Sequence, residues 1–484
     1  MRIHALVFAT LSAILSASPA IGEDETTYFA VLLEGKKAGT GLLRRQVASG
    51  LVTTTEMQTI TLGRMGTNIT ITVTAKTVET VEGKPLAFEV SQDMGMGPMT
   101  TKGTVDREGK LKLTTTGAGK VQRLTLDWPE GAVLNEGVRL GLLKTHLKPG
   151  ATYTARMFNP LLQYTVETKF TIGAKRKVDL LGRVVELTEI TSVSAGPMGR
   201  IVGTDYVDKD LRRLKSITPM LGMNLELIAC SKEVALAKAD VADFFDRLIL
   251  ASPAPLGDLA SAKAITYLLK PTNPQFNVPE TDNQKVRKTA DGAVEVVVRP
   301  AVPLKGAAFP YKGKDERLLE ALEPNRYLDS DDKRVAALAA RAVGDATDAA
   351  VAAKRIEEFV RKYVMEKNLS VGYATASEVA AGRQGDCTEH AVLTAAMCRA
   401  SGIPAEVVAG VVYISSFGVR KDVFAPHAWA RANVGGRWIG LDAAMKGYDA
   451  GHIALAIGNG EPKSFFAMIP ALGYFTIEKV TVVK

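Results

Sequence analysis

The sequence predicts an α+β fold: a large, mainly antiparallel β domain, then a small β module, then a C-terminal domain of helices and strands. From about Glu23 to Glu233, apolar and polar residues alternate in runs rich in Thr and Val, which is the period of half-buried strands. After about Pro310 the apolar residues recur at helical spacing. Two short strand-like runs separated by prolines lie between these regions.

The region 23–233 is interpreted as a β-rich domain of unknown role. Ile69 and Ile71 alternate with Thr, and further strands are expected over 164–171 and 184–190. Because one face of each strand is polar, we expect a curled sheet or half barrel with that face in water. The region contains one histidine, His146, and no cluster of metal-ligand type, so the sequence predicts no chemistry here.

The region 234–310 is interpreted as a small β module or linker, with strands expected over 262–269 and 293–299. Residues 311–484 form the C-terminal domain. Val335, Leu338 and Ala339 share one face of a helix that Asp329 or Ser330 is expected to cap. We read the acidic run around these caps as helix capping rather than as a calcium site.

The first 22 residues resemble an export signal. Arg2 precedes a thirteen-residue apolar run from Ala5 to Ala17, and small residues suited to cleavage follow. This run is too short for a membrane-spanning helix, which needs about 20 residues. The sequence therefore predicts a signal peptide over 1–22, a periplasmic or extracellular protein, and no membrane span.

Composition points away from nucleic acid. Lys and Arg total 60 against 52 acidic residues, a net charge of +8, but the basic residues occur in small scattered groups. A nucleic-acid-binding surface would need a basic run or patch with interleaved aromatic residues. We therefore expect no nucleic-acid partner, and the sequence leaves the oligomeric state open.

Three cysteines, Cys230, Cys387 and Cys398, are too few for a disulfide scaffold in an exported protein. Cys387 and Cys398 lie eleven residues apart in one predicted helix, which separates them by about 16 Å. That distance is beyond disulfide reach, so at least one thiol stays free. A free thiol in an exported protein is a candidate nucleophile.

The segment Gly385–Ala391 begins a buried helix. Asp386 at the N-cap and Glu389 three residues later form a capping-box pattern, and the helix is expected to end at Gly402. Cys387 therefore lies in the first turn, where the positive end of the helix dipole favours a thiolate. Cys398 is expected to be an inert residue of the helix interior.

His427 is the best-placed base for this thiolate. It lies in a strand expected over 424–434, which runs into Gly435 and Gly436, a hairpin signal. If these two glycines are the loop, Trp429 pairs with Asp442, and His427 and Asp442 are diagonal neighbours on one face. A loop of three residues would break this parity.

These motifs resemble the transglutaminase-like superfamily, in its bacterial secreted branch. The resemblance covers about residues 325–458. It is carried by Gly385-Asp386-Cys387, Arg399–Pro404, His427-Ala428-Trp429 and Trp438–Asp442, and a later segment, Asp449–Ile453, is also similar. It implies a papain-like catalytic domain with Cys387 as nucleophile, His427 as base and Asp442 as the residue that orients the base.

The chemistry implied is acyl transfer at protein or peptide amide bonds through a thioester on Cys387, with no cofactor and no metal. The Cys387 backbone N–H is the first oxyanion donor expected, and Gln384 or Tyr373 is a candidate second donor. His390 and Trp429 are expected to support the site rather than to react.

Three functions remain open from the sequence. Hydrolysis of peptide or other amide bonds is favoured. The alternatives are a protein-glutamine γ-glutamyltransferase, which passes the acyl group to an amine, and a non-catalytic binding module of the cell envelope. An intact triad argues against the third.

Overall fold

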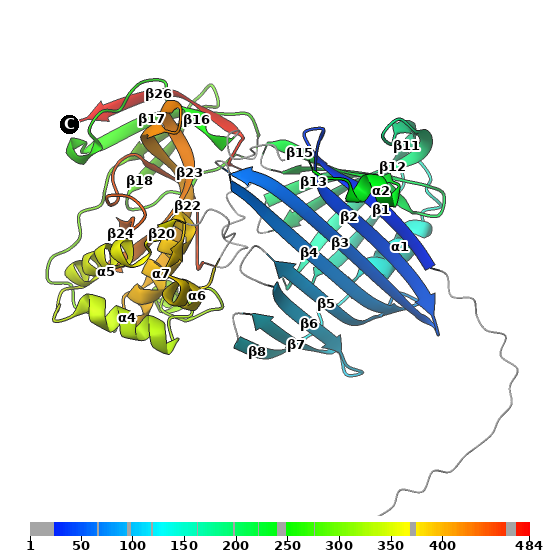
Figure 1. Ribbon diagram of the computed structural model, residues 1–484, viewed down its shortest axis with the longest axis horizontal. Coiled ribbons are helices and arrows are strands. Elements are labelled where there is room, and N and C mark those ends of the chain that lie inside the picture. Colours follow the sequence, from blue (N-terminus) through cyan, green and yellow to red (C-terminus); the bar gives the residue numbers. More distant parts are fainter. Residues whose placement is uncertain are drawn as a thin grey trace, which may run out of the picture.

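The computed structural model describes residues 24–64, 67–93, 98–117, 120–161, 163–196, 199–220, 222–239, 248–274, 276–367, 374–460 and 471–484. The expected signal peptide lies outside these ranges, as does Tyr373. A β-rich part and a mixed part with helices lie side by side (Figure 1). Among the described residues, no helix has the length and apolar character needed to cross a membrane.

The predicted β domain is confirmed as one 15-stranded sheet that stays open, with β8 and β9 at its two ends. Neighbouring strands are antiparallel except for β9 and β10, which pair in parallel. The strands are β1 (Asp24–Leu33), β2 (Lys36–Ala48), β3 (Leu51–Arg64), β4 (Thr67–Thr80), β5 (Pro85–Asp93), β6 (Pro98–Val105), β7 (Lys110–Gly117), β8 (Lys120–Asp127), β9 (Ala132–Val133), β10 (Thr152–Asn159), β11 (Tyr164–Asp179), β12 (Val184–Gly196), β13 (Gly199–Val207), β14 (Arg213–Met220) and β15 (Met223–Cys230).

The sheet curls around helix α1 (Asn135–Leu143), which contacts β3 and β4 on one side and β9 and β10 on the other (Figure 1). Val138 and Leu142 of α1 pack with Phe170 and Ile190 of the sheet. The Glu79 carboxylate of β4 accepts the Glu136 and Gly137 amides at 2.7 and 3.0 Å. An anion at this end stabilises the helix, because the first amides have no partner within it.

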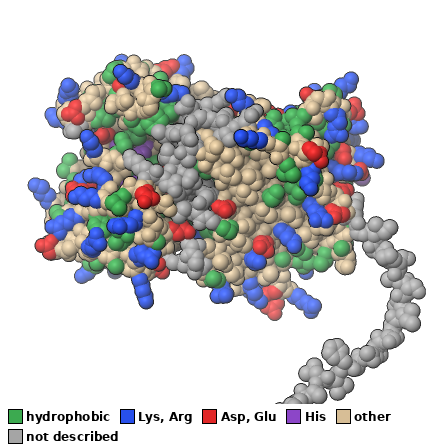
Figure 2. All heavy atoms as spheres, viewed as in Figure 1, with side chains coloured by type: hydrophobic (Ala, Val, Ile, Leu, Met, Phe, Trp, Pro, Cys, Tyr) green, Lys and Arg blue, Asp and Glu red, His purple; other side chains and the backbone are tan. Residues whose placement is uncertain are grey.

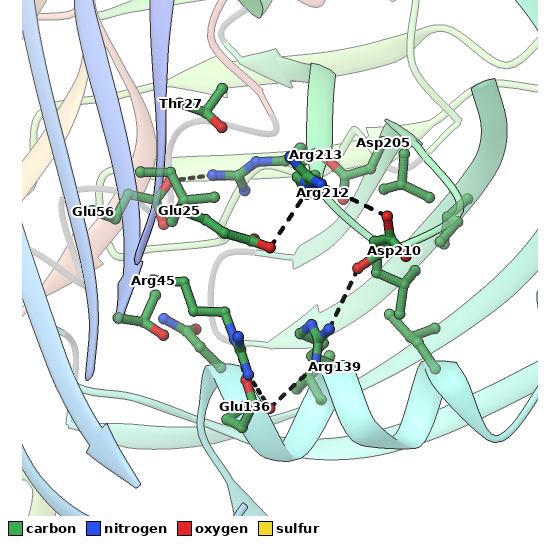
Figure 3. Close-up of a pocket in the computed structure, with 18 of the residues that line it drawn as sticks. Glu25, Thr27, Arg45, Glu56, Glu136, Arg139, Asp205, Asp210, Arg212 and Arg213 are labelled. Carbon is green, nitrogen blue, oxygen red and sulfur yellow. Dashed lines mark hydrogen bonds and ion pairs between the residues drawn. The ribbon is translucent and has the colours of Figure 1, made fainter. Parts of the chain in front are cut away.

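A cavity of about 250 Å³ lies inside the curl, between α1 and strands from both halves of the sheet (Figure 3). The apolar side chains of the core line one part of it, and four arginines line the rest. Each arginine forms an ion pair with an acidic residue that also lines the cavity: Arg45 and Arg139 with Glu136, Arg212 with Glu25 and Asp210, and Arg213 with Glu56. The pairs Arg45–Glu136, Arg212–Glu25 and Arg213–Glu56 tie α1, the β13–β14 turn and β14 to the opposite strands.

Charge is dispersed over the face shown in Figure 2, where Lys and Arg side chains are interspersed with acidic ones. A broad uncharged area covers β3 and β4 (Figure 2), whose paired threonines include Thr59 with Thr72 and Thr61 with Thr70. This is the wet, Thr-rich strand face that the sequence predicts.

The region expected to be a connector forms a four-stranded sheet with a distant strand. The elements before α3 (Glu316–Glu320) are helix α2 (Lys232–Leu236), β16 (Leu250–Ala251), the short 3₁₀ helix η2 (Leu259–Ser261), β17 (Ala264–Pro271), β18 (Gln284–Lys288) and β19 (Val294–Val298). Strand β26 (Phe475–Val483) lies at the far end of the described chain. The strand order is β18-β19-β17-β26. Both strands predicted in this region are present as β17 and β19.

The C-terminal part packs helices against a five-stranded sheet of order β16-β23-β22-β25, with β24 paired to β23. Its elements are α3 (Glu316–Glu320), α4 (Lys333–Val343), α5 (Ala349–Tyr363), β20 (Glu366–Lys367), α6 (Ala376–Gly382), β21 (Gln384–Gly385), α7 (Cys387–Ala400), β22 (Ala405–Phe417), β23 (Arg420–Val434), β24 (Arg437–Leu441) and β25 (His452–Gly458). Helix α7 is central, since it contacts α4, α5, α6, β22 and β23.

The cap expected for the helix at 333–343 is wrong. Asp332, rather than Asp329 or Ser330, caps α4 by accepting the Arg334 amide at 2.9 Å. Asp329 is used elsewhere, because its carboxylate accepts the Ser377 amide at 3.0 Å. Several adjacent residues of the same capping type could not be ranked from sequence.

The pairing of β17 with β26 offers a test of the expected boundary at residue 310. A fragment of 311–484 lacks β17 and its buried Ile265, Tyr267 and Leu269, each worth roughly 1.5–3 kcal/mol of burial. Since a domain's net stability is about 5–15 kcal/mol, we expect this fragment to be unfolded and 248–484 to be folded. Circular dichroism and limited proteolysis of both fragments make the comparison; a cooperatively folded 311–484 would contradict it.

Candidate active site

Cys387 lies half-buried in the first turn of α7. The Asp386 carboxylate accepts the Thr388 amide at 2.7 Å, and the Glu389 carboxylate accepts the Asp386 amide at 2.9 Å. The predicted capping box is therefore present. Gly385 has φ +149°, and a Cβ there would lie 2.3 Å from the Glu389 Cβ, so the residue before the cap has to be glycine.

His427 and Asp442 meet across the β23–β24 hairpin. Val434 pairs with Arg437 and Ala430 with Leu441, the register that a two-glycine loop predicts. Beyond the last pair, the His427 Nε2 lies 2.8 Å from the Asp442 Oδ2. The loop parity thus brings the acid and the imidazole into direct contact.

The structure also brings Cys387 to His427. The Cys387 side chain is hydrogen-bonded to the His427 ring. Because Nε2 contacts Asp442, Nδ1 is the ring nitrogen left available for the thiol. The three side chains predicted from sequence to react together are therefore in one continuous contact.

Charge within this group is stabilised by mutual contact. Burial opposes a charged His427, but the Asp442 carboxylate and the Cys387 thiolate outweigh it, so the pKa of His427 lies well above its ordinary value. Burial likewise opposes a charged Asp442, yet His427 first and His452 second hold the pKa of Asp442 well below its usual range. Both shifts favour the ionised acid and the protonated imidazole.

Backbone and side-chain contacts fix Asp442 in place. Its Oδ1 accepts the Ala444 and Met445 amides at 2.9 and 3.1 Å. Its own amide donates to the Glu357 Oε1 at 2.7 Å, and Arg361 donates to its carbonyl at 3.3 Å. Helix α5 therefore holds the backbone of the orienting acid through two side chains.

The other predicted residues surround this group. Gln384 is half-buried in β21, directly before Gly385. His390 is buried, with its Nδ1 2.6 Å from the Asp386 carbonyl oxygen, so it supports the start of α7. The Trp429 ring is stacked on the His427 ring, with centroids 6.2 Å apart. Tyr373 lies outside the described residues.

The other two thiols differ from Cys387. Cys398 is fully buried in α7, and burial raises the pKa of its thiol to about 12. Cys230 lies at the end of β15, where burial also raises the thiol pKa. All three cysteines are free thiols in the structure.

Sequence reasoning missed three polar residues near the site. His452 begins β25, and its Nε2 lies 2.9 Å from the Asp442 Oδ2. Asp449 contacts the other ring nitrogen of His452 at 3.0 Å. Glu357 is an acid within the apolar periodicity of α5. The scarcity of histidine and the spacing of Asp449 and His452 are the signals that could have indicated the first two.

His427, Asp442 and His452 are the one group among the described residues whose ligand atoms lie close enough to hold a metal ion, within 4.8 Å of one another. Both Nε2 atoms already contact the same carboxylate oxygen. An ion there would displace the proton that His427 shares with Asp442. We therefore interpret the group as a hydrogen-bonded array.

Residues 336–443, which contain Cys387, His427 and Asp442, match the model of the transglutaminase-like superfamily. The C-terminal part of the chain is a transglutaminase-like domain. The predicted resemblance is confirmed at the level of this family, which covers the helix of Cys387 and the hairpin of His427 and Asp442. No curated protein matches the chain.

Solved structures similar to the chain are remote. A candidate cysteine protease from Cytophaga hutchinsonii is 18% identical with a TM-score of 0.30, over 46% of this chain and 88% of that one. A β-barrel-like protein of unknown function from Brucella abortus is 11% identical with a TM-score of 0.34, over 43% and 95%. A candidate protease from Parabacteroides distasonis is 12% identical with a TM-score of 0.19, over 76% and 68%.

Proposed function

We propose that the protein is an exported cysteine-dependent amidase or peptidase that acts on protein or peptide amide bonds through Cys387, His427 and Asp442. One observation carries this proposal: the His427 ring contacts the Asp442 carboxylate through Nε2 and also interacts with the Cys387 side chain. A thiol, an imidazole and an orienting acid in this order are the parts that nucleophilic acyl transfer needs.

In the first half of the reaction, the Cys387 thiolate attacks the amide carbonyl carbon and a tetrahedral oxyanion forms. The Cys387 amide, at the start of α7, is suited to donate to that oxyanion, and Gln384 is the candidate second donor. The C–N bond then breaks as His427 Nδ1–H gives its proton to the departing amine. A thioester on Cys387 remains.

In the second half, His427 is neutral and accepts a proton from water as the water oxygen attacks the thioester carbonyl. The C–S bond breaks, the carboxylic acid leaves, and the thiolate and imidazolium are restored. Asp442 holds the ring orientation throughout and stabilises its charged form. Water needs no further binding site, whereas transfer to an amine needs a site for the acceptor.

The acceptor can be decided with a glutamine-containing peptide and a labelled primary amine. We expect release of ammonia with conversion of glutamine to glutamate, and no incorporation of the labelled amine. The Cys387→Ala variant is the control for ammonia released without the enzyme. Incorporation of the amine in place of hydrolysis would instead support a γ-glutamyltransferase, and absence of both products from a panel of peptides would leave a binding role.

Export is part of the proposal. It is supported by Arg2, by the apolar leader over residues 5–17 and by the small residues that follow it. Fractionation of cells that express the full chain, with mass-spectrometric determination of the mature N-terminus, tests it.

A further inference from the structure

His452 is a buried histidine that the reaction described above does not use. It is the first residue of β25, which pairs with β22 on the side away from β23, and its side chain is 1% exposed. Its Nε2 lies 2.9 Å from the Asp442 Oδ2, the same oxygen that His427 contacts at 2.8 Å. Two imidazoles therefore donate to one carboxylate oxygen.

The second nitrogen of His452 also faces oxygen acceptors. Its Nδ1 lies 3.0 Å from the Asp449 Oδ1 and 3.1 Å from the Asp449 carbonyl oxygen, and the Asp449 amide donates toward it over the longer distance of 3.4 Å. A neutral imidazole has only one N–H. Because both nitrogens have carboxylate oxygens as their nearest partners, the doubly protonated ring is the form that satisfies this geometry.

The groups around His452 favour the same form. The Tyr448, Trp429 and His427 rings surround it at centroid distances of 4.7, 5.1 and 6.0 Å. From β17, the Tyr267 hydroxyl donates to the Ala450 carbonyl. Burial lowers the pKa of His452, but the contacts with Asp442 and Asp449 outweigh burial, so this pKa is raised.

A buried carboxylate alone would make His427 a poor acid. Asp442 and the thiolate both stabilise the protonated ring, and a proton held too firmly is not released to the departing amine. A positive charge on His452, on the far side of Asp442, weakens the hold on the His427 proton. The charged His452 ring competes for the same carboxylate oxygen and offsets the negative charge of Asp442. Negative and positive charges then alternate along the series of contacts Asp449, His452, Asp442, His427 and Cys387.

We propose that His452 is a positioning residue that acts through Asp442: held in its protonated form by Asp449, it offsets part of the carboxylate charge and keeps His427 able to give up its proton. This inference rests on the proposed acyl-transfer function. It assigns roles to His452 and Asp449 that the three reacting residues do not need by themselves.

This inference is tested by the pH dependence of Cys387 alkylation. The full chain is treated with iodoacetamide at a series of pH values, and the rate is measured by mass spectrometry of the Cys387 peptide. In the wild type we expect two inflections, the upper one at the pH where His427 loses its proton. His452→Gln keeps a donor toward Asp442 but removes the charge, so the protonated His427 becomes more stable. The upper inflection should then rise by about one pH unit.

Two further variants separate charge from packing. Asp449→Asn keeps the His452 ring in place but removes the carboxylate that favours its protonated form, so the upper inflection should rise by a smaller amount. Tyr448→Leu disturbs the packing around His452 without changing a charge on it, and both inflections should stay where they are in the wild type.

An upper inflection that is unchanged in folded His452→Gln overturns the inference and leaves the proposed function standing. If His452→Gln does not fold, Asp449→Asn decides, and an unchanged profile there also overturns it. A single inflection at an ordinary thiol pKa in the wild type overturns the assignment of Cys387 and His427 as an ion pair, and this inference with it. A shift in Tyr448→Leu equal to that in His452→Gln assigns the effect to packing and overturns the inference.

Discussion

Cys387→Ala is expected to abolish amide turnover while the fold is retained. Loss of the nucleophile from a catalytic triad costs about 10⁶-fold in kcat. The helix start does not depend on this side chain, because Asp386 and Glu389 make the capping contacts of α7. Turnover of the peptide and the far-ultraviolet circular dichroism of the variant are the two measurements.

The matched control is Cys398→Ala, eleven residues along the same helix. Its side chain is fully buried, so its loss should lower the free energy of unfolding by roughly 1 kcal/mol, comparable with the loss of one buried methyl group, and leave turnover intact. Iodoacetamide should label Cys387 before Cys230 and Cys398 in the native protein. Retained turnover in Cys387→Ala, or equal labelling of the three thiols, would show that Cys387 is not the nucleophile.

Asp442→Asn is the second large effect. An asparagine keeps the shape of the side chain but offers His427 an amide in place of a charge, which favours the wrong tautomer and destabilises the protonated ring. The corresponding change in a Ser-His-Asp enzyme lowers kcat by about 10⁴-fold, and we expect a loss of similar size. Asp422→Asn is the control, since Asp422 lies in β23, the strand of His427, but its carboxylate accepts from Tyr413.

The free energy of unfolding of Asp442→Asn should differ from that of the wild type by an amount that depends on pH. The pKa of Asp442 is lowered in the folded state, so its contribution is present above an unfolded pKa of about 4 and is lost as the pH falls below that value. The pKa of His427 is raised, so its contribution is full below about pH 6.5 and is lost as the pH rises through the folded value.

The difference in unfolding free energy between wild type and Asp442→Asn should therefore be largest between about pH 4 and 6.5, where it should reach about 2 kcal/mol. Urea unfolding of both proteins across the pH range measures it. A difference that does not change with pH would mean that the His427–Asp442 contact carries no charge.

The contacts that sequence could predict are those set by short-range rules. The cap at Asp386 follows from residue type and spacing, and the meeting of His427 with Asp442 follows from the parity of a two-residue loop. Both depend on residues within about 20 positions of each other in one element or one hairpin, where backbone geometry leaves few alternatives.

The contacts that sequence could not predict join elements whose relative placement no local rule fixes. His452 reaches Asp442 only because β25 pairs with β22 on the side away from β23. Glu357 lies among the apolar residues of the buried face of α5. The spacing of these residues predicts a buried helix face, but it does not predict that Glu357 accepts the Asp442 amide. The pairing of β17 with β26 could not be predicted for the same reason, because Ala264 and its partner Val483 lie far apart in the sequence.

The β17–β26 pairing also sets an order of events during synthesis. Strand β17 emerges from the ribosome before the helix of Cys387, but its partner β26 follows that helix by more than 70 residues. Contacts this distant in sequence form slowly, because a long loop must close before they contribute. The edge of β17 that β26 pairs with therefore stays open while the nucleophile helix is already made, and this sheet is completed only once β26 has been synthesised.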